Sequence, residues 1–310
     1  MSALSREQLE HAVATVAERF SGELGFAAKN LATGEEVLHQ ADAMLPTASV
    51  IKIVVMIEMF AQAEEGLLNL GERIEMAGSD IVLGSGVLRD LTPGLSPTVL
   101  DLATLMVIVS DNTATNMLID RIGGVDVVNQ RIHGGYGVDS VVLHNRIDFE
   151  KIGDNVRRLA EATPRGLTTI MEMMAQGRLV SEQACKQMLG IMSRQVYLDQ
   201  VPRYLNTNAF WKELGMSGDF TVASKTGFFP GTRVDTGVIT TPVSQIVYTA
   251  MAHGADDKSM GFEAEPAVVN GVLGRLVVEY WWPGASERGA VVTSPYFDQY
   301  SKVTTPIGRS

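Results

Sequence analysis

Strand-like segments lie near both ends of this 310-residue chain, and helical segments fill its middle. Residues 24–31 and 35–39 flank an Ala-Thr-Gly turn, which predicts a hairpin. Three more strands are predicted at 220–225, 233–240 and 245–252. An antiparallel sheet built from both ends of the chain, flanked by helices and interrupted by an all-helical lobe, fits this order. The predicted fold is therefore α/β in the broad sense (α+β).

Helices are predicted where apolar residues recur at helical spacing. Ser5 and Gln8 suit a capping box at the start of the first helix. The predicted helices are 5–20, 51–65, 99–109, 112–122, 125–133, 165–176, 181–193 and 264–282. Residues 67–98 and 134–164 are expected to be irregular.

We predict three regions. They are an α/β lobe of residues 1–48 and 218–282, an all-helical lobe of residues 49–217 with an omega-like loop at about 143–164, and a tail of residues 283–310. The tail carries Tyr296, Phe297 and Tyr300. These aromatic side chains would dock the tail on the body or make a homo-oligomer; a loose tail is the equally weighted alternative.

Composition excludes several classes of protein. The net charge of −11 argues against a nucleic-acid partner and against binding to an anionic membrane surface. The longest apolar run, Val50 to Phe60, is interrupted by charges and too short to cross a bilayer. The first residues do not resemble a signal peptide, so we expect a cytoplasmic protein, or a periplasmic or secreted one if a leader has been removed.

No cofactor or metal is expected. The five histidines are scattered and none pair at metal-ligand spacing. The single cysteine, Cys185, lies in a helical pattern and is interpreted as a small packed residue. We also find no glycine-rich phosphate loop. The expected partner is a small-molecule substrate.

Three short motifs carry the chemistry. They are Ser49-Val-Ile-Lys52, Ser110-Asp-Asn112 and Lys225-Thr-Gly227, separated by 61 residues (49 to 110) and 115 residues (110 to 225). Each motif alone has a structural interpretation, since Ser49 or Asp111 would serve as a helix cap and Lys-Thr-Gly would end a strand. Their joint occurrence in this order favours a catalytic site.

Ser49 and Lys52 are one helical turn apart, so their side chains share a face and the amine is expected to reach the hydroxyl. A serine hydroxyl becomes a good nucleophile when a neighbour takes its proton. Burial beside other cations would lower the pKa of Lys52 enough for this role. The sequence therefore predicts acyl transfer with Ser49 as the nucleophile.

The ordered set of motifs resembles that of class A β-lactamases, and the resemblance extends over roughly residues 5 to 282. Residues 24–37 resemble that family's opening hairpin, and 110–118 its central helical stretch. The resemblance implies the β-lactamase/transpeptidase-like layout. It also implies an oxyanion hole made by the backbone amides of Ser49 and Phe228.

The same resemblance assigns further roles. Ser110 would pass a proton to the leaving atom, and Asn112 would position the substrate amide. Lys225 and Thr226, with Gly227 beside them, would bind a substrate carboxylate. Arg233 on the following strand would assist, although an ordinary surface arginine is at least as good an interpretation.

The chain departs from the family at the loop that supplies the deacylating glutamate. If Arg146 is aligned, Asp148 falls in the glutamate position with a side chain one methylene shorter. Glu150 is the other candidate, and both acids would otherwise be solvated loop residues. The family's aromatic gatekeeper is also replaced, by residues 83–86 (Leu-Gly-Ser-Gly), which predicts a more open or flexible entrance.

The preferred interpretation is a serine hydrolase acting through an acyl-enzyme on an amide, lactam or ester with a nearby carboxylate. One alternative is a small-molecule amidase or esterase without real β-lactamase activity. Another is a penicillin-binding sensor that is acylated without turnover. The last is a scaffold that has kept the motifs without activity.

Overall fold

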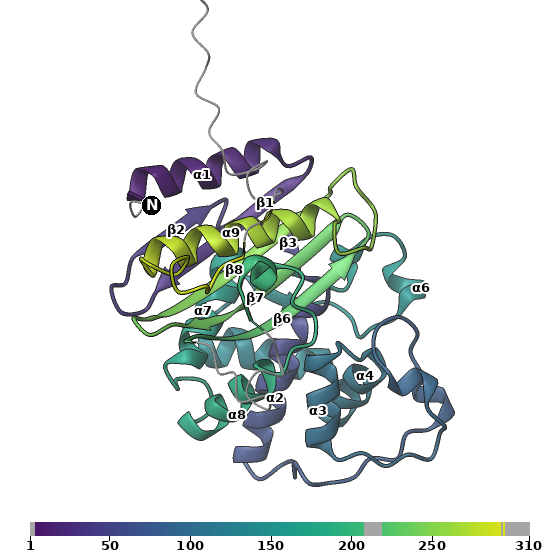
Figure 1. Ribbon diagram of the computed structural model, residues 1–310. Coiled ribbons are helices and arrows are strands. Elements are labelled where there is room, and N and C mark those ends of the chain that lie inside the picture. Colours follow the sequence, from purple (N-terminus) through teal and green to yellow (C-terminus); the bar gives the residue numbers. More distant parts are fainter. Residues whose placement is uncertain (1–3, 208–218, 293, 295–310) are drawn as a thin grey trace, which may run out of the picture.

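A computed structural model describes residues 4–207, 219–292 and 294 of the chain. At its centre is a five-stranded antiparallel sheet in the order β2-β1-β8-β7-β6 (Figure 1). Its strands are β1 (Glu23–Asn30), β2 (Glu36–His39), β6 (Thr221–Phe229), β7 (Thr232–Thr240) and β8 (Gln245–His253). Strand β6 lies at the edge of the sheet. The predicted α+β class with an antiparallel sheet is confirmed.

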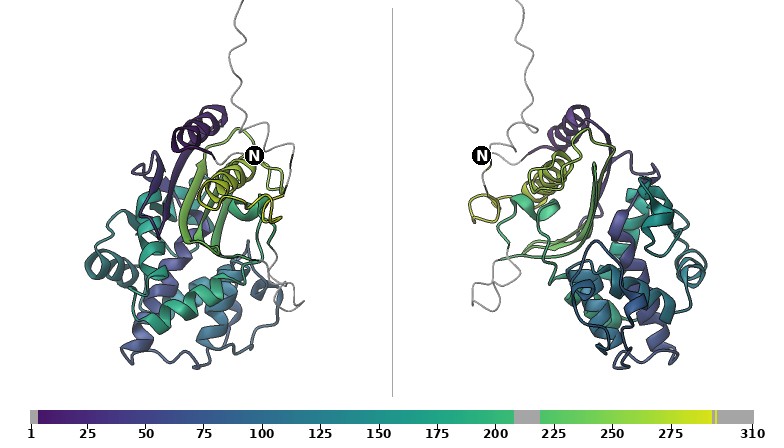
Figure 2. Two further views of the ribbon diagram at one scale, coloured as in Figure 1. Left: turned by 60° about the vertical axis from the view of Figure 1, so that its left-hand side comes forward. Right: turned by 90° about the vertical axis from the view of Figure 1, so that its right-hand side faces the viewer.

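Helices cover both faces of this sheet (Figure 2). On one face lie α1 (Arg6–Arg19) and α9 (Glu265–Trp281), whose apolar residues share one core with the sheet. A second core lies between the other face and the helical part of the molecule. The helices that lie between β2 and β6 along the chain are α2 (Lys52–Glu64), α3 (Val99–Ile108), α4 (Asn112–Arg121), α5 (Val125–Gln130), α6 (Phe149–Ile152), α7 (Pro164–Ala175) and α8 (Glu182–Met192).

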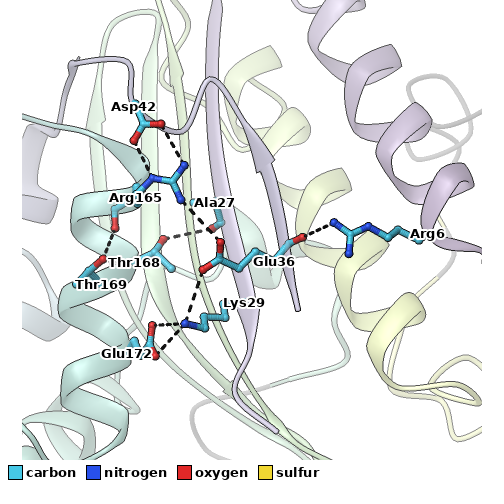
Figure 3. Close-up of polar contacts among 9 residues, drawn as sticks. All are labelled: Arg6, Ala27, Lys29, Glu36, Asp42, Arg165, Thr168, Thr169 and Glu172. Carbon is cyan, nitrogen blue, oxygen red and sulfur yellow. Dashed lines mark hydrogen bonds and ion pairs between the residues drawn. The ribbon is translucent and has the colours of Figure 1, made fainter. Parts of the chain in front are cut away.

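Helix α7 is attached to the β1–β2 side of the sheet by charged and hydroxyl side chains (Figure 3). The Lys29 ammonium donates to both carboxylate oxygens of Glu172, at 3.0 and 2.9 Å. The buried Thr168 hydroxyl donates to the Ala27 carbonyl of β1 at 3.3 Å. Partly exposed ion pairs contribute little to stability, so apolar packing provides most of the attachment and the polar contacts fix its register.

A second, small sheet was not predicted. It has the order β3-β5-β4, with strands β3 (Leu45–Pro46), β4 (Val141–Leu143) and β5 (Ala160–Ala162). Such short strands have no periodicity that a sequence pattern could reveal. Strand β3 ends two residues before the 3₁₀ turn Ala48–Ile51, so this sheet helps to place Ser49.

Several predictions concern the tail and the lobe limits. Tyr296, Phe297 and Tyr300 lie outside the described residues, so the proposed oligomer contact stays a prediction, as do the lobe boundaries.

Within the described ranges, no helix is long and apolar enough to span a bilayer. In the same ranges, no group of three His, Cys, Asp or Glu side chains is placed to hold a metal ion. Cys185 is buried and its Sγ donates to the Leu179 carbonyl, as expected for a packed residue.

Candidate active site

Ser49 lies in the 3₁₀ turn that leads into α2, and its side chain is half-buried. The edge strand β6 approaches this turn at Gly227. A Cβ atom at position 227 would lie 2.9 Å from the Ser49 backbone nitrogen and 2.6 Å from the Thr47 carbonyl oxygen. Only glycine permits this contact. Ala48 has a φ of 43°, so the backbone just before Ser49 is also strained.

Lys52 is the first residue of α2 and is buried. Its Nζ donates to the Ser110 carbonyl at 2.6 Å, to Ser110 Oγ at 3.1 Å and to Asn112 Oδ1 at 2.8 Å. All three protons of the ammonium group are therefore used. Within the described residues, no hydrogen bond joins Lys52 to Ser49; the structure brings Lys52 to the second motif.

Ser110 lies between the two motif lysines. Its Oγ accepts hydrogen bonds from Lys52 Nζ and from Lys225 Nζ, each at 3.1 Å. Both lone pairs of the hydroxyl are thereby occupied, and its own proton is left to donate. Ser110 is buried and has a φ of 56°, in the left-handed region that non-glycine residues rarely adopt. The strained backbone between α3 and α4 thus holds this hydroxyl between the two lysines.

Asp111 has a structural role. One carboxylate oxygen accepts from the Ala114 amide at 2.9 Å and caps α4. The other accepts from the amides of Val87 and Leu88 at 2.7 and 2.8 Å. The helix-cap interpretation of this residue is therefore correct, and the same carboxylate also holds the loop beside the site.

Asn112 connects Lys52 to the loop of residues 83–86. Its Nδ2 donates to the Leu83 carbonyl at 2.9 Å, and its backbone amide donates to the Ser85 carbonyl at 3.0 Å. Gly84 has a φ of 96°, and a Cβ there would lie 2.7 Å from Asn112 Nδ2 and 3.1 Å from the Phe149 ring. The glycine that predicted an open entrance therefore permits close packing, and the loop is bonded to α4.

Lys225 is buried on β6, where its Nζ donates to the Thr226 carbonyl at 2.7 Å as well as to Ser110. Burial lowers the pKa of Lys225 to about 7, and the Asp235 carboxylate opposes the shift. Burial, reinforced by the charge of Lys225, lowers the pKa of Lys52 well below its usual value. The charge of Lys225 thus disfavours protonation of Lys52 on the other side of Ser110.

Thr226 has a buried hydroxyl with no hydrogen-bond partner within the described residues. A buried hydroxyl without a partner costs free energy, so this one is suited to bind an incoming acceptor group.

Arg233 is not a surface arginine, because it is 2% exposed. Its guanidinium group donates to the carbonyls of Phe229 and Thr232 at 3.1 and 2.9 Å. It also lies over the Phe228 ring, 6.0 Å from the centroid. Burial lowers the pKa of Arg233. Arg233 therefore supports the strand end that carries Phe228.

The structure does not join Asp148 to the motif residues. Its Oδ1 accepts from the amides of Glu150 and Lys151 at 3.1 and 3.3 Å and caps α6. Its Oδ2 lies 3.7 Å from Lys151 Nζ. Neither Asp148 nor Glu150 makes a hydrogen bond or ion pair with Lys52 among the described residues.

The loop before α6 is fixed at Ile147. The Asn116 side chain donates to the Ile147 carbonyl at 2.8 Å and accepts from its amide at 2.9 Å. The acid that would serve deacylation stays a prediction.

Residues 195–201 have no strong functional signal in the sequence, yet they bond to the segments on both sides of the site. Val196 donates to the Ile108 carbonyl and Gln200 to the Gly227 carbonyl. Tyr197 packs against Phe228 with ring centroids 5.6 Å apart. Only the buried glutamines Gln195 and Gln200 distinguish this stretch from an ordinary connector, and buried amides indicate polar anchoring.

Comparisons with known proteins agree with this geometry. A family model described as the β-lactamase enzyme family matches residues 8–281. The chain therefore belongs to the β-lactamase enzyme family. The predicted resemblance to class A β-lactamases is confirmed.

Individual relatives are distant. β-Lactamase L2 of Stenotrophomonas maltophilia is 29% identical over 178 residues, which cover 57% of this chain and 55% of that protein. A β-lactamase of Bacillus licheniformis is 25% identical over 262 residues, covering 83% and 80%. The chain spans about half the length of the first curated relatives it matches.

Solved structures match over most of the chain. The β-lactamase from Sphaerobacter thermophilus DSM 20745 is 27% identical, with a TM-score of 0.78, over 94% of this chain and all of that one. PBP-A is 27% identical, with a TM-score of 0.75, over 89% and 95%.

Proposed function

We propose that the protein is a serine hydrolase of the class A β-lactamase type that forms an acyl-enzyme on Ser49. Its substrate would be an amide, lactam or ester with a nearby carboxylate. The observation that carries this proposal is the Ser110 hydroxyl held between two buried lysines, each 3.1 Å away. Lys225 lies on β6, which approaches the Ser49 turn at Gly227, and Lys52 follows that turn in the chain. This arrangement would supply a base, a proton carrier and an anion site for one nucleophile.

Acylation would begin with removal of the Ser49 proton by neutral Lys52. A neutral amine has two N–H bonds and one lone pair, so one of the three present contacts of Lys52 must be released. The lone pair then accepts the proton while Ser49 Oγ bonds to the substrate carbonyl carbon. Burial, together with the charge of Lys225, lowers the pKa of Lys52 well below its usual value, and this direction supports a role as base.

The negative charge on the carbonyl oxygen would be stabilised by the backbone amides of Ser49 and Phe228 across the close contact at Gly227. When the carbon–nitrogen or carbon–oxygen bond breaks, Ser110 would donate its proton to the leaving atom. Ser110 would regain a proton from Lys52, which donates to it and which took its extra proton from Ser49. Lys52 is then neutral again, and the net result is the transfer of one proton from Ser49 to the leaving group.

The substrate carboxylate would bind between Lys225 and Thr226. The positive charge of Lys225 attracts it, and the Thr226 hydroxyl, unpartnered within the described residues, would donate to it. Asn112, which is fixed by Leu83 and Lys52, would present its amide group to the acyl part of the substrate.

Deacylation needs a water molecule and a base. Asp148 is proposed for this step from its position in the motif, although its carboxylate caps α6 in the structure. Catalytic contacts often tighten only when substrate binds, so the capping contact is compatible with the role.

The central test is to incubate the protein with a chromogenic β-lactam and with small carboxylate-bearing esters. Product release and intact mass are followed together, with Ser49→Ala as the control. We expect a transient adduct and turnover, both lost in Ser49→Ala. An adduct without turnover would support the sensor instead, turnover of esters alone would support the esterase, and no adduct with any acyl donor would contradict the proposal.

A further inference from the structure

Residues 195–201, which we call the strap, connect the helical part of the site to the sheet. At one end, the Val196 amide donates to the Ile108 carbonyl at 3.1 Å. The buried Gln195 side chain donates to the Val107 carbonyl at 3.1 Å and accepts from the Tyr197 amide at 3.1 Å. Ile108 is two residues before Ser110. This end of the strap is therefore fixed next to the proton carrier of the site.

The other end of the strap is fixed to the sheet. Gln200 is fully buried, and its Nε2 donates to the Gly227 carbonyl at 3.2 Å. The Val201 amide donates to Oδ2 of the buried Asp235 at 3.0 Å. Gly227 is the residue that contacts the Ser49 turn. The strap thus spans the site from Ser110 to the strand that carries Lys225 and Thr226.

Between these anchors lies an aromatic corner made by Tyr197 and Phe228. The two rings meet edge to face, with an interplanar angle of 74°. Arg233 lies over the Phe228 ring, with its guanidinium carbon 6.0 Å from the ring centroid, and so helps to fix it. Both aromatic residues are only half-buried, so part of each ring remains available for contact. Rings held in this way lose little conformational entropy when they bind another ring.

The corner lies between the segments that carry the two groups assigned to the leaving side. The Ile108 carbonyl that anchors the strap is two residues before Ser110, which would protonate the leaving atom. Gly227, the other anchor, is two residues after Lys225, which would bind the carboxylate.

We propose that Tyr197 and Phe228 bind a flat, unsaturated ring in the departing part of the substrate, next to its carboxylate. The substrate class is thereby narrowed to acyl compounds whose leaving group is a carboxylate-bearing planar ring, either free or fused to a lactam. This inference deepens the proposed function and depends on it.

The test compares two esters with the same N-acetylglycyl group. One has 3-hydroxybenzoate as its leaving group, and the other has cis-3-hydroxycyclohexanecarboxylate, which is similar in size but not flat. The readout is the ratio of the two kcat/KM values, aryl over cyclohexyl, relative to the wild-type ratio. The intrinsic difference in leaving ability cancels in this comparison.

We expect Tyr197→Leu to lower the ratio about three- to tenfold, the range for loss of one aromatic contact. Tyr197→Phe, which keeps the ring and removes the hydroxyl, should retain the ratio within about twofold. Tyr280→Leu is the matched control, because Tyr280 lies on α9 and donates to Glu35 away from the site. It should leave the ratio unchanged.

Equal losses on both esters in Tyr197→Leu, or an unchanged ratio, would overturn the inference while leaving the proposed function intact. Hydrolysis of neither ester by the wild-type protein would contradict the proposed function itself, and the inference with it. Thermal unfolding of each variant verifies that it folds, and Phe228→Leu is the second variant expected to lower the ratio if Tyr197→Leu fails to fold.

Discussion

The two motif lysines have the same side chain and nearly the same burial, yet their surroundings suit different tasks. Lys52, at the start of a helix, has three acceptors and lies next to a second cation. Lys225, on the edge strand, has two acceptors, and burial lowers its pKa to about 7 while the Asp235 carboxylate opposes the shift. For Lys52, the charge of Lys225 adds to the effect of burial and Asp111 opposes it, so the neutral form of a base is favoured. The ammonium form of Lys225 prevails below about pH 7 and can there receive an anion. Chemical role is thus set by the neighbours of the amine.

Removing one amine at a time tests this division most strongly. Lys52→Met should slow acylation of Ser49 by about 10²- to 10⁴-fold, because the general base is lost. Lys225→Met should instead raise KM mainly for substrates that carry a carboxylate. Stopped-flow acylation and intact mass measure both effects. If both variants lost acylation rate and raised KM to the same extent, the two lysines would not have separate roles.

Neither lysine contacts Asp148, so release of the acyl group can be separated from its formation. Asp148→Asn keeps a good helix cap for α6 and removes the base. We expect deacylation to slow about 100-fold while acylation is retained, so that the acyl-enzyme accumulates. The lifetime of the adduct, followed by mass spectrometry, measures this. An unchanged lifetime would assign Asp148 to capping alone.

The Asp111 carboxylate acts on Lys52 through its charge, because it opposes the lowering of the pKa of this lysine. Asp111→Asn would turn an NH₂ group toward backbone amides that now donate to it, those of Val87 and Leu88. We expect a loss of about 2–3 kcal/mol in the free energy of unfolding. Asp101→Asn, at the exposed cap of α3, should cost under about 1 kcal/mol. Urea denaturation compares the two, and equal costs would contradict the buried role.

The charge of Lys225 should set a pH limit on substrate binding. Its pKa in the folded protein is lowered, so the ammonium form prevails below about pH 7 and is lost as the pH rises through that value. The kcat/KM for a carboxylate-bearing ester should therefore fall above pH 7, by up to about tenfold per pH unit. The matching methyl ester should lack this fall. A common profile for both esters would show that Lys225 does not bind the carboxylate.

The strands, the long helices and the three motifs were predictable because each has a local signal: alternation, helical spacing or a cap. The end of β6 was not, since Lys225-Thr-Gly resembles a strand end, whereas pairing with β7 continues to Phe229. The burial of Arg233 depends on neighbours more than 20 residues away, such as Ser259. The Tyr197 corner also depends on long-range anchors that leave no periodic pattern. The residues that carry the proposed chemistry could therefore be predicted from the sequence, and the long-range contacts that surround them could not.

The pairing of β1 with β8 has a consequence for how the protein is made. Glu23 pairs with His253, so the central sheet joins chain segments more than two hundred residues apart. During synthesis, the nucleophile emerges from the ribosome long before the strands that complete its surroundings. Contacts of such long range are slow to form. A nascent chain that ends before β8 would therefore contain all three motifs and still have no assembled catalytic centre.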